Sequence, residues 1–377
     1  MGAVERRALV FELAADLGFD LAGAAPVAPP PAADRLDGWL ARGLHAGLDW
    51  MERERARLVD PRRLLPGARG LLMVGMVHAR PAVDLEGGGR VARYAAGRDY
   101  HNVLGKKLRK LRRRLSERGV LGDSRQVVDA GPLMERSHAA AAGLGFESKA
   151  ANLLHPRFGP WFFLAGVLVD FELEPSGAAA VGSCGTCRAC IDACPTAAIL
   201  EPGVVDAGRC ISYHTIESSG PAPLELRARF GTWVFGCDVC SEVCPFGKRA
   251  PDRSDSFGTH PAVAEGRLVD WLRAPVAGHG ERMRGSPLSR ATRGGLARNA
   301  AVALGNSPSD AGRDALIDAL EDPEERVRDA ALWALERAHG GEKSAQRALE
   351  RAVARPVDSE EARRARATRA AAADERA

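Results

Sequence analysis

The sequence predicts an α+β multidomain protein in three parts, followed by an Ala- and Arg-rich tail. Alternating strand-like and helical segments predict an α/β domain over residues 1–175. A dense group of cysteines predicts a ferredoxin-like module over 176–255. Two similar helical segments predict a HEAT-like domain over 256–345, and residues 346–377 form the tail.

Composition describes an ordinary globular chain. The 377 residues are 45% hydrophobic and 27% charged, with a net charge of +4. No segment approaches the ~20 apolar residues of a membrane span. The N-terminal segment 5–26 opens with a twin arginine, but Glu12, Asp16 and Asp20 interrupt the region that a secretory signal keeps uncharged. We therefore expect an amphipathic first helix and a cytoplasmic protein, whose reduced cysteines are available for metal or redox chemistry.

Five segments predict the α/β domain. Hydrophobic runs at 67–79, 124–133 and 159–173 predict strands, and the segments 101–118 and 134–144 predict helices. No dinucleotide-binding or P-loop glycine motif follows a strand, so the sequence gives no support to nicotinamide or nucleotide chemistry.

The first cysteine motif has the spacing C-x2-C-x2-C-x3-C-P. It comprises Cys184, Cys187, Cys190 and Cys194, followed by Pro195. In bacterial ferredoxins this spacing places three thiolates on one [4Fe–4S] cluster and sends the fourth to a second cluster.

The second motif, C-x2-C-x3-C-P, lacks one early cysteine, and Cys210 is the only one left to complete it. The crossing rule predicts one cluster on Cys184, Cys187, Cys190 and Cys244, and another on Cys194, Cys210, Cys237 and Cys240. Zinc is the alternative, because paired C-x2-C units also bind it, but zinc does not require the x3-C-P endings.

Two further features have both a functional and a structural interpretation. Asp129 ends a hydrophobic strand, where α/β domains hold ligands, but it could equally cap the turn that contains Gly131 and Pro132. Residues 106–114 hold seven Lys and Arg in nine positions, which suits either an anionic partner or one solvated helix face.

The C-terminal prediction comes from internal similarity. Residues 296–306 and 326–337 both combine basic residues with apolar residues at helical spacing. Stacked units of this kind usually bind a macromolecule, although they could also serve as a lid over the relay.

Several stretches together resemble the epoxyqueuosine reductase family of tRNA-modifying enzymes, which is related to corrinoid-dependent reductive dehalogenases. The most specific are "RYAAGRDYH" (93–101) and "VDAGPLMER" (128–136), followed by the cysteine motifs. The resemblance extends from about residue 5 to 340. It implies an α/β cobalamin-binding domain, a ferredoxin module and a HEAT-like domain, which together convert epoxyqueuosine to queuosine at the tRNA wobble position.

The resemblance also implies cofactors and residue roles. Cob(II)alamin and two [4Fe–4S] clusters are the expected cofactors, and Asp129 is the expected proton donor, kept protonated by burial beside the corrinoid. Residues expected at or near the corrinoid, besides Asp129, are Arg57, Tyr94, Lys149, Asn152, Leu153, Ser212, Asp238 and Val239.

The implied partners are tRNA and a low-potential electron donor, with no membrane, and we expect a monomer. Lys106, Lys107, Arg109 and Lys110 are the expected tRNA contacts. The chain departs from the family at Phe146, where tryptophan is expected, at Ser148, where glycine is expected, and at His214, where an apolar residue is expected.

Three other functions compete with this interpretation. A corrinoid-dependent dehalogenase would share the cofactors but act on an organohalide. A ferredoxin-type electron carrier would not bind cobalamin tightly. A helical-repeat scaffold with structural clusters would be insensitive to Asp129→Ala.

Overall fold

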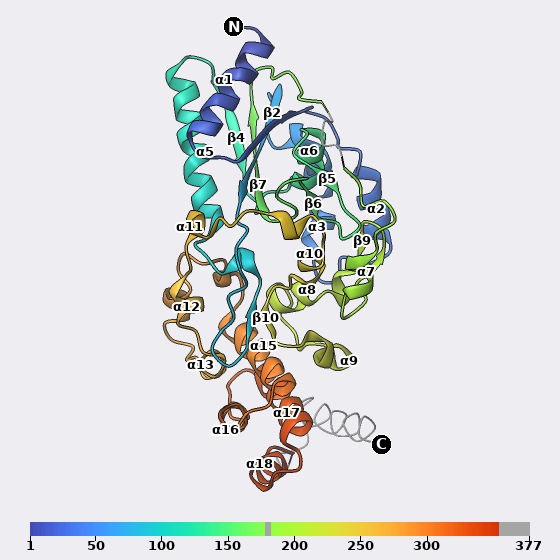
Figure 1. Ribbon diagram of the computed structural model, residues 1–377, viewed down its shortest axis with the longest axis vertical. Coiled ribbons are helices and arrows are strands. Elements are labelled where there is room, and N and C mark those ends of the chain that lie inside the picture. The colour runs from blue at the N-terminus through green and yellow to red at the C-terminus, as the bar shows by residue number, and fades with distance from the viewer. Residues whose placement is uncertain (178–181, 354–377) are drawn as a thin grey trace. The chain divides into compact units, whose positions relative to one another are not determined.

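A four-stranded sheet lies at the centre of the N-terminal part of the chain (Figure 1). The computed structural model describes residues 1–177 and 182–353. The strand order is β1-β2-β7-β4, and every pairing is antiparallel. The strands are β1 (Leu21–Ala25), β2 (Gly70–Val77), β7 (Phe162–Val169) and β4 (Ser124–Val127).

The predicted strands are present but shorter than their hydrophobic runs. The antiparallel pairing also removes our sequence-based reason for a ligand site near Asp129, because the strand-end rule applies to parallel sheets. The first helix, α1 (Ala3–Asp16), ends earlier than the expected segment 5–26, and β1 follows it. Small residues dominate β1, so it has no strong strand signature.

Helices cover both faces of this sheet. In Figure 1, α1 and α5 (Tyr100–Glu117) lie on one side and α6 (Glu135–Ala141) on the other. A leucine stripe on α5 is buried, at Leu104, Leu108, Leu111 and Leu115. Asp99 caps the start of α5, and Gly119, in the left-handed region at φ +66°, follows its end.

The chain forms two units, and each is discontinuous in sequence. The first contains Met1–Pro81, Arg98–Gly208 and Asp238–Gly258, and the second contains Ala82–Gly97, Arg209–Cys237 and the described residues from Thr259 onward. The domains predicted from the sequence, with boundaries at 175, 255 and 345, are instead contiguous in sequence, and these boundaries stay predictions.

Short elements complete the first unit. They are α2 (Ala33–Ala41), α3 (Trp50–Arg53), α4 (Arg55–Val59), β5 (Phe146–Glu147), β6 (Leu153–Leu154), α7 (Ala189–Ala193), β8 (Ile199–Glu201), β9 (Val204–Val205), α10 (Val239–Glu242) and α11 (Ser254–Phe257).

The second unit is mostly helical. A short parallel pair, β3 (Arg90–Val91) and β10 (Trp233–Phe235), packs with the helix α8 (Ile211–Ile216). Four longer helices follow: α15 (Arg293–Asn306), α16 (Asp310–Ala319), α17 (Glu325–His339) and α18 (Lys343–Val353). The similar segments 296–306 and 326–337 lie in α15 and α17, which pack together. The short helices are α9 (Leu224–Arg227), α12 (Pro261–Ala264), α13 (Leu268–Leu272) and α14 (His279–Arg282).

Most of the predicted tail, 354–377, lies outside the described residues. Within 1–177 and 182–353, no helix has both the length and the apolar character that crossing a membrane requires.

Candidate functional site

Asp129 lies on a tight turn two residues after β4. Its backbone is in the left-handed region, with φ at +55°, which Asp tolerates better than most residues with a Cβ. Its N–H donates to Oε1 of Glu135 at 2.9 Å, and Glu135 is the first residue of α6. The Asp129 side chain is 60% exposed, so the turn presents its carboxylate at the surface of the first unit.

Two side chains from the first turn of α5 reach this carboxylate. The Tyr100 hydroxyl donates to Oδ2 of Asp129, and Nε2 of His101 lies 3.5 Å from the same oxygen. Nδ1 of His101 lies 2.8 Å from Oδ1 of Asp99, the capping residue of α5. The Tyr100 ring stacks on Phe163 of β7, with centroids 4.2 Å apart and planes 7° apart. The carboxylate therefore has a fixed polar environment within one unit.

These contacts determine the charge of Asp129 and His101. Desolvation by the neighbouring protein atoms opposes the charged form of the partly exposed Asp129, but hydrogen bonds from His101 and Tyr100 outweigh it and lower the pKa of Asp129 below its usual 3.8. Burial also opposes charge on His101, yet its hydrogen bonds to Asp129 and Asp99 raise the pKa of His101 to about 9. At neutral pH the pair is therefore a carboxylate beside an imidazolium. Among the protein's own groups the hydrogen bonds outweigh desolvation, and the expectation that burial beside a corrinoid keeps Asp129 protonated stays a prediction.

Glu135 is a second titratable group on the same turn. Burial, together with the negative charge of Asp129, raises the pKa of Glu135 to about 8. Glu135 is therefore largely neutral at pH 7, while its Oε1 still accepts the Asp129 N–H.

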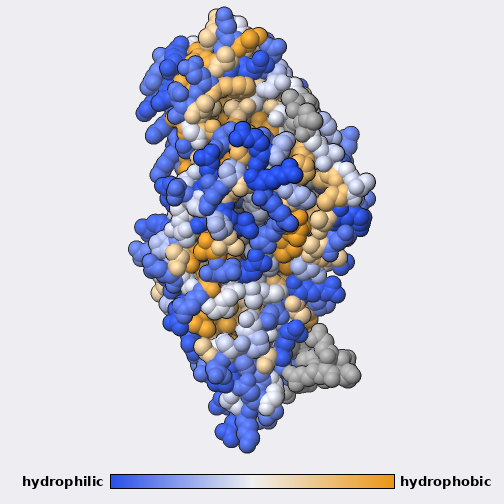
Figure 2. Space-filling model, in the orientation of Figure 1, coloured by the Kyte–Doolittle hydropathy of each residue, from blue (hydrophilic) through white to orange (hydrophobic). Residues whose placement is uncertain are grey.

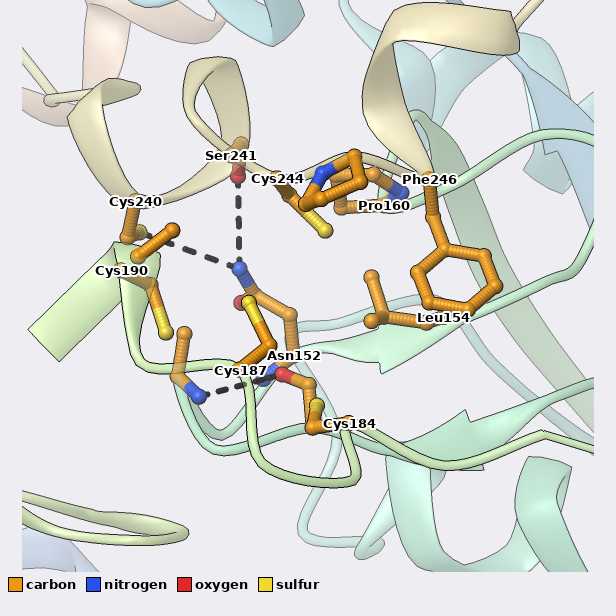
Figure 3. A pocket seen from close by; sticks show the side chains of 14 residues that line it. Asn152, Leu154, Pro160, Cys184, Cys187, Cys190, Cys240, Ser241, Cys244 and Phe246 are labelled. Carbon is orange, nitrogen blue, oxygen red and sulfur yellow. Dashed lines mark hydrogen bonds between the residues drawn. The ribbon is translucent and has the colours of Figure 1, made fainter.

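Five cysteines line one pocket of the first unit (Figure 3). Four of them, Cys184, Cys187, Cys190 and Cys244, are the set that the crossing rule assigns to one cluster. Cys184 and Cys187 lie on the loop that leads into α7, Cys190 lies in α7, and Cys244 follows α10, which packs against α7. Cys240 lines the same pocket, although the rule assigns it to the other set. Soft thiolate donors gathered in this way suit an iron–sulfur cluster.

Two of the side chains expected at the corrinoid instead contact the cysteine segments. Nζ of Lys149 donates to the carbonyls of Gly185 at 2.7 Å and Cys187 at 2.9 Å. Nδ2 of Asn152 donates to Oγ of Ser241 at 3.3 Å and points toward Sγ of Cys240 (Figure 3). Lys149 thus holds the first cysteine loop, and Asn152 holds the second motif. Their roles toward a corrinoid stay predictions.

The cysteines assigned to the other predicted cluster are divided between the two units in sequence. Cys194 and Cys240 belong to the first, and Cys210 and Cys237 to the second. Cys210 caps α8, and Cys237 lies two residues after the end of β10. Their grouping on one cluster stays a prediction.

The remaining residues expected near the corrinoid have varied environments. Arg57 is exposed and pairs with Glu54 at 3.1 Å. Leu153 is buried in the core of the first unit, so its side chain packs rather than faces solvent. The backbone carbonyl of buried Asp238 accepts from Ser241 and Glu242 at the start of α10, whose first residue is Val239.

Tyr94 and Ser212 belong to the second unit. The Tyr94 ring lies 6.3 Å from that of Phe235, and Ser212 is the second residue of α8. Neither contact tests a role in binding a corrinoid.

The departures at Phe146 and Ser148 have a local explanation. Oγ of Ser148 accepts from the backbone N–H groups of Ala150 and Asn152, and the positive φ of this turn falls on Ala151. The turn therefore does not require glycine at 148. The Phe146 ring packs edge-on against Phe246, with centroids 5.4 Å apart.

The basic run divides into an exposed group and an internal residue. Lys106, Arg109 and Lys110 are exposed on α5, and Figure 2 shows hydrophilic surface along the edge that α5 occupies in Figure 1. Lys107 instead donates to the backbone carbonyl of Leu17, and its Nζ lies 6.0 Å from the Phe19 ring centroid. Burial lowers the pKa of Lys107. Three of the four predicted tRNA contacts are thus exposed, and their role toward tRNA stays a prediction.

Sequence reasoning missed Tyr100, His101 and Glu135 as members of this site. Tyr100 and His101 belong to "RYAAGRDYH" and Glu135 to "VDAGPLMER", so both segments were identified. What was missing was the tertiary contact between the start of α5 and the turn after β4, which spacing along the chain does not encode.

Comparison with known proteins matches two families. A family model described as "Epoxyqueuosine reductase QueG, DUF1730" matches residues 58–130. A second, described as a 4Fe–4S double cluster binding domain, matches residues 183–247, a range that includes all eight cysteines of the chain.

Curated relatives match along most of the chain. An epoxyqueuosine reductase of Aliivibrio fischeri is 36% identical over 316 residues, which is 82% of this chain and 84% of the relative. One from Xanthomonas campestris is 38% identical over 344 residues, covering 86% and 93%.

Solved structures match in fold. An epoxyqueuosine reductase crystallised with an epoxyqueuosine-modified tRNA-Tyr stem loop superposes with a TM-score of 0.88 at 27% identity, covering 97% of this chain and 98% of that one. A Bacillus subtilis epoxyqueuosine reductase, whose aspartate-bearing catalytic loop is swung out of the active site, gives 0.87 at 27% identity, with the same coverage.

Proposed function

Because this chain belongs to the epoxyqueuosine reductase family, we propose that it reduces epoxyqueuosine to queuosine at the wobble position of tRNA. The observation that carries the proposal is the Asp129 turn, where an exposed carboxylate is held by Tyr100 and His101 in the unit that also contains the cysteine-lined pocket. The Bacillus subtilis relative has an aspartate on its catalytic loop, which supports the same role for Asp129.

The reaction sets a requirement for protons. Converting an epoxide to an alkene breaks two C–O bonds, consumes two electrons and two protons, and releases the oxygen as water. A proton donor near the oxygen lowers the barrier to this departure. Asp129 is the group of this chain that we assign to deliver these protons, one at a time.

His101 can recharge Asp129 between deliveries. Asp129 is a carboxylate at rest, so it must gain a proton before it can give one. The imidazolium of His101 lies 3.5 Å from its Oδ2, and Asp99 holds the other ring nitrogen. Approach of the substrate excludes water and favours transfer of this proton to the carboxylate, because both groups then become neutral.

Iron–sulfur clusters supply the electrons, and the double-cluster match covers the segment that bears them. We propose that Cys184, Cys187, Cys190 and Cys244 hold one [4Fe–4S] cluster and that Cys194, Cys210, Cys237 and Cys240 hold the other.

Cob(II)alamin is the second proposed cofactor. When bound, its reduced cobalt supplies the low-potential nucleophile that epoxide opening requires. Exposed Arg57 is one candidate to contact it. The other predicted contacts are Tyr94, Lys149, Asn152, Ser212, Asp238 and Val239. Leu153 fits this role poorly, because its side chain is committed to the core.

The exposed basic residues of α5 are the proposed tRNA contacts. His101 and Lys110 are nine residues apart on one helix, which is about 14 Å along its axis. A stem loop whose wobble base reaches Asp129 can therefore place backbone phosphates along Lys106, Arg109 and Lys110. We also propose that α15 to α18 form a HEAT-like domain and that the protein is a cytoplasmic monomer. A low-potential electron donor is the remaining proposed partner.

The experiment that tests the proposal compares the native protein with Asp129→Asn. Both are reconstituted anaerobically with iron, sulfide and cobalamin and assayed on tRNA carrying epoxyqueuosine. We expect the variant to keep its iron and corrinoid content and to lose about 10²- to 10⁴-fold in turnover.

Asp123→Asn is the matched control, because Asp123 is exposed and lies at the opposite end of β4. The control should turn over at the native rate. Native turnover by Asp129→Asn would contradict the assignment of Asp129 as proton donor.

A further inference from the structure

Helix α15 is buried on every side. All residues from Arg293 to Gly305 are buried, and α15 packs against β10, α8, α13 and α17 within the second unit (Figure 1). Most of these residues are small or apolar, but Arg298 and Asn299, which are 1% and 3% exposed, are strongly polar. Polar groups so deeply buried need partners for their hydrogen bonds.

Asn299 joins the two segments that lead to Cys210 and Cys237. Its Nδ2 donates to the carbonyl of Thr215 in α8 at 2.9 Å and to that of Val234 in β10 at 2.8 Å. Cys210 caps α8, and Cys237 lies three residues after Val234. A single side-chain amide therefore uses both of its N–H groups to bridge the two cysteine segments.

Arg298 binds the C-terminal end of α8 and the residues that follow it. Its guanidinium donates to the carbonyls of His214 and Gly220, and to that of Ser218 at 3.0 Å. It also donates to Oδ1 of Asn299, which orients the amide so that its N–H groups face α8 and β10. The unexpected residue His214 thus takes part through its backbone.

Thr215 completes the connection. Its Oγ1 accepts the N–H of Gly236 at 3.0 Å and donates to the carbonyl of Ile211 at 2.8 Å. Gly236 immediately precedes Cys237 and has φ at +69°, and a Cβ there would come within 2.5 Å of Ala92. The backbone on the N-terminal side of Cys237 is therefore tied to the turn of α8 that follows Cys210.

We propose that Asn299, oriented by Arg298, is a positioning residue that fixes the spacing of Cys210 and Cys237 for a shared [4Fe–4S] cluster. The first helix of the C-terminal repeat is then part of the scaffold of that cluster. This inference rests on the proposed assignment of the cysteines to two clusters, and it does not depend on the tRNA substrate.

The test replaces Asn299 with aspartate, which has nearly the same shape but no N–H groups. Asn299→Asp places an oxygen against two carbonyl oxygens and should loosen α8 from β10. We expect iron and acid-labile sulfide to fall by half after anaerobic reconstitution, from the content of two clusters to that of one. The electron paramagnetic resonance spectrum of the reduced variant should match that of Cys210→Ser.

Asn306→Asp is the matched control. Asn306 ends the same helix, and its Nδ2 also donates to two carbonyls, those of Arg227 and Gly231, which do not flank a cysteine. This control should keep the iron and sulfide of both clusters.

Three outcomes would overturn the proposal. Native iron and an unchanged spectrum in Asn299→Asp would show that Asn299 does not position the ligands. Equal loss in Asn306→Asp would reduce the effect to general destabilisation of α15. Native iron in Cys210→Ser would remove the premise that Cys210 is a ligand. None of these readouts uses tRNA, so a chain that bears both clusters but leaves epoxyqueuosine unchanged would contradict the proposed function alone.

Discussion

Helices α5 and α15 both carry basic side chains, and they use them in opposite ways. On α5 a leucine stripe faces the sheet, and Lys106, Arg109 and Lys110 stay exposed. On α15 the basic residues Arg293 and Arg298 are themselves buried. An exposed basic residue of a helix is therefore available to bind a polyanion, whereas a buried one forms hydrogen bonds within the protein.

The buried arginines of α15 differ in how their charge is satisfied. Arg293 pairs with the buried carboxylate of Asp322, and this hydrogen bond raises the pKa of Arg293. Arg298 binds backbone carbonyls and the Asn299 amide. Burial lowers the pKa of Arg298 to about 10, so it is still charged at neutral pH. The planar guanidinium group can donate to several fixed acceptors at once, which suits a buried site. Within the described part of the chain, the exposed basic face of α5 has no fixed acceptors of this kind to satisfy.

The largest effect that we expect on α5 is a loss of turnover when His101, in its first turn, is replaced. The native rate should decline as pH rises through about 9, because His101 then loses the proton that recharges Asp129. His101→Gln keeps a hydrogen-bond donor but carries no transferable proton, so turnover should fall about 10²-fold and lose this alkaline limb. Rates measured from pH 6 to 10 check both points.

Stability should change with pH in the same direction. The pKa of His101 is higher in the folded chain than its ordinary 6.5, so its stabilisation is complete below pH 6.5 and is lost as pH rises through about 9. The apparent Tm of His101→Gln should therefore depend less on pH over this interval than that of the native protein. A variant that kept both the native rate and the alkaline limb would remove His101 from the proton path.

The next effect concerns the exposed face of α5. Replacing Lys106, Arg109 and Lys110 together with glutamine should weaken tRNA binding about tenfold at low salt and reduce the slope of log affinity against log salt by about 2 to 3. Binding titrations at several salt concentrations measure both quantities. Iron content should not change, since the three side chains are exposed on α5, away from the cysteine pocket lining. An unchanged salt slope would make the basic face a solvated surface with no role in binding.

The smallest effect separates Lys107 from its neighbours on the same helix. Lys107→Met removes one positive charge, but this ammonium group is bonded to Leu17 and packed near Phe19. We expect tRNA affinity to stay within about twofold, because no phosphate contact is lost. Stability should fall by about 1 kcal/mol, as for a lost hydrogen bond. A loss of salt slope equal to that of an exposed lysine would instead extend the tRNA-binding face to Lys107.

The same contrast explains what could be predicted from the sequence. The helix over 101–118 and the cysteine spacing from Cys184 to Cys190 are local patterns, and the structure places a helix and a cysteine-lined pocket there. The strand β1 was missed because Ala and Gly give little strand preference. The antiparallel order of the sheet was missed because alternation of elements does not fix strand direction.

Long-range polar contacts were the least predictable part of the site. Nothing in the spacing of Asp129 shows that Tyr100 and His101 will reach its carboxylate, and the direction of its pKa shift depends on that contact. Likewise, "LARNAAVALGN" indicates a helix but not that Arg298 and Asn299 face inward. Such contacts are set by tertiary packing, which patterns along the chain do not encode.

Reduction of epoxyqueuosine in tRNA changes the mass of the modified nucleoside, which can be measured. The anaerobically reconstituted and reduced protein is incubated with tRNA carrying epoxyqueuosine, with and without cobalamin, and the nucleosides are analysed by mass spectrometry. We predict the loss of one oxygen atom from the nucleoside, dependent on cobalamin. A protein that bears both clusters and the corrinoid yet leaves the nucleoside mass unchanged would contradict it and favour a dehalogenase-like substrate instead.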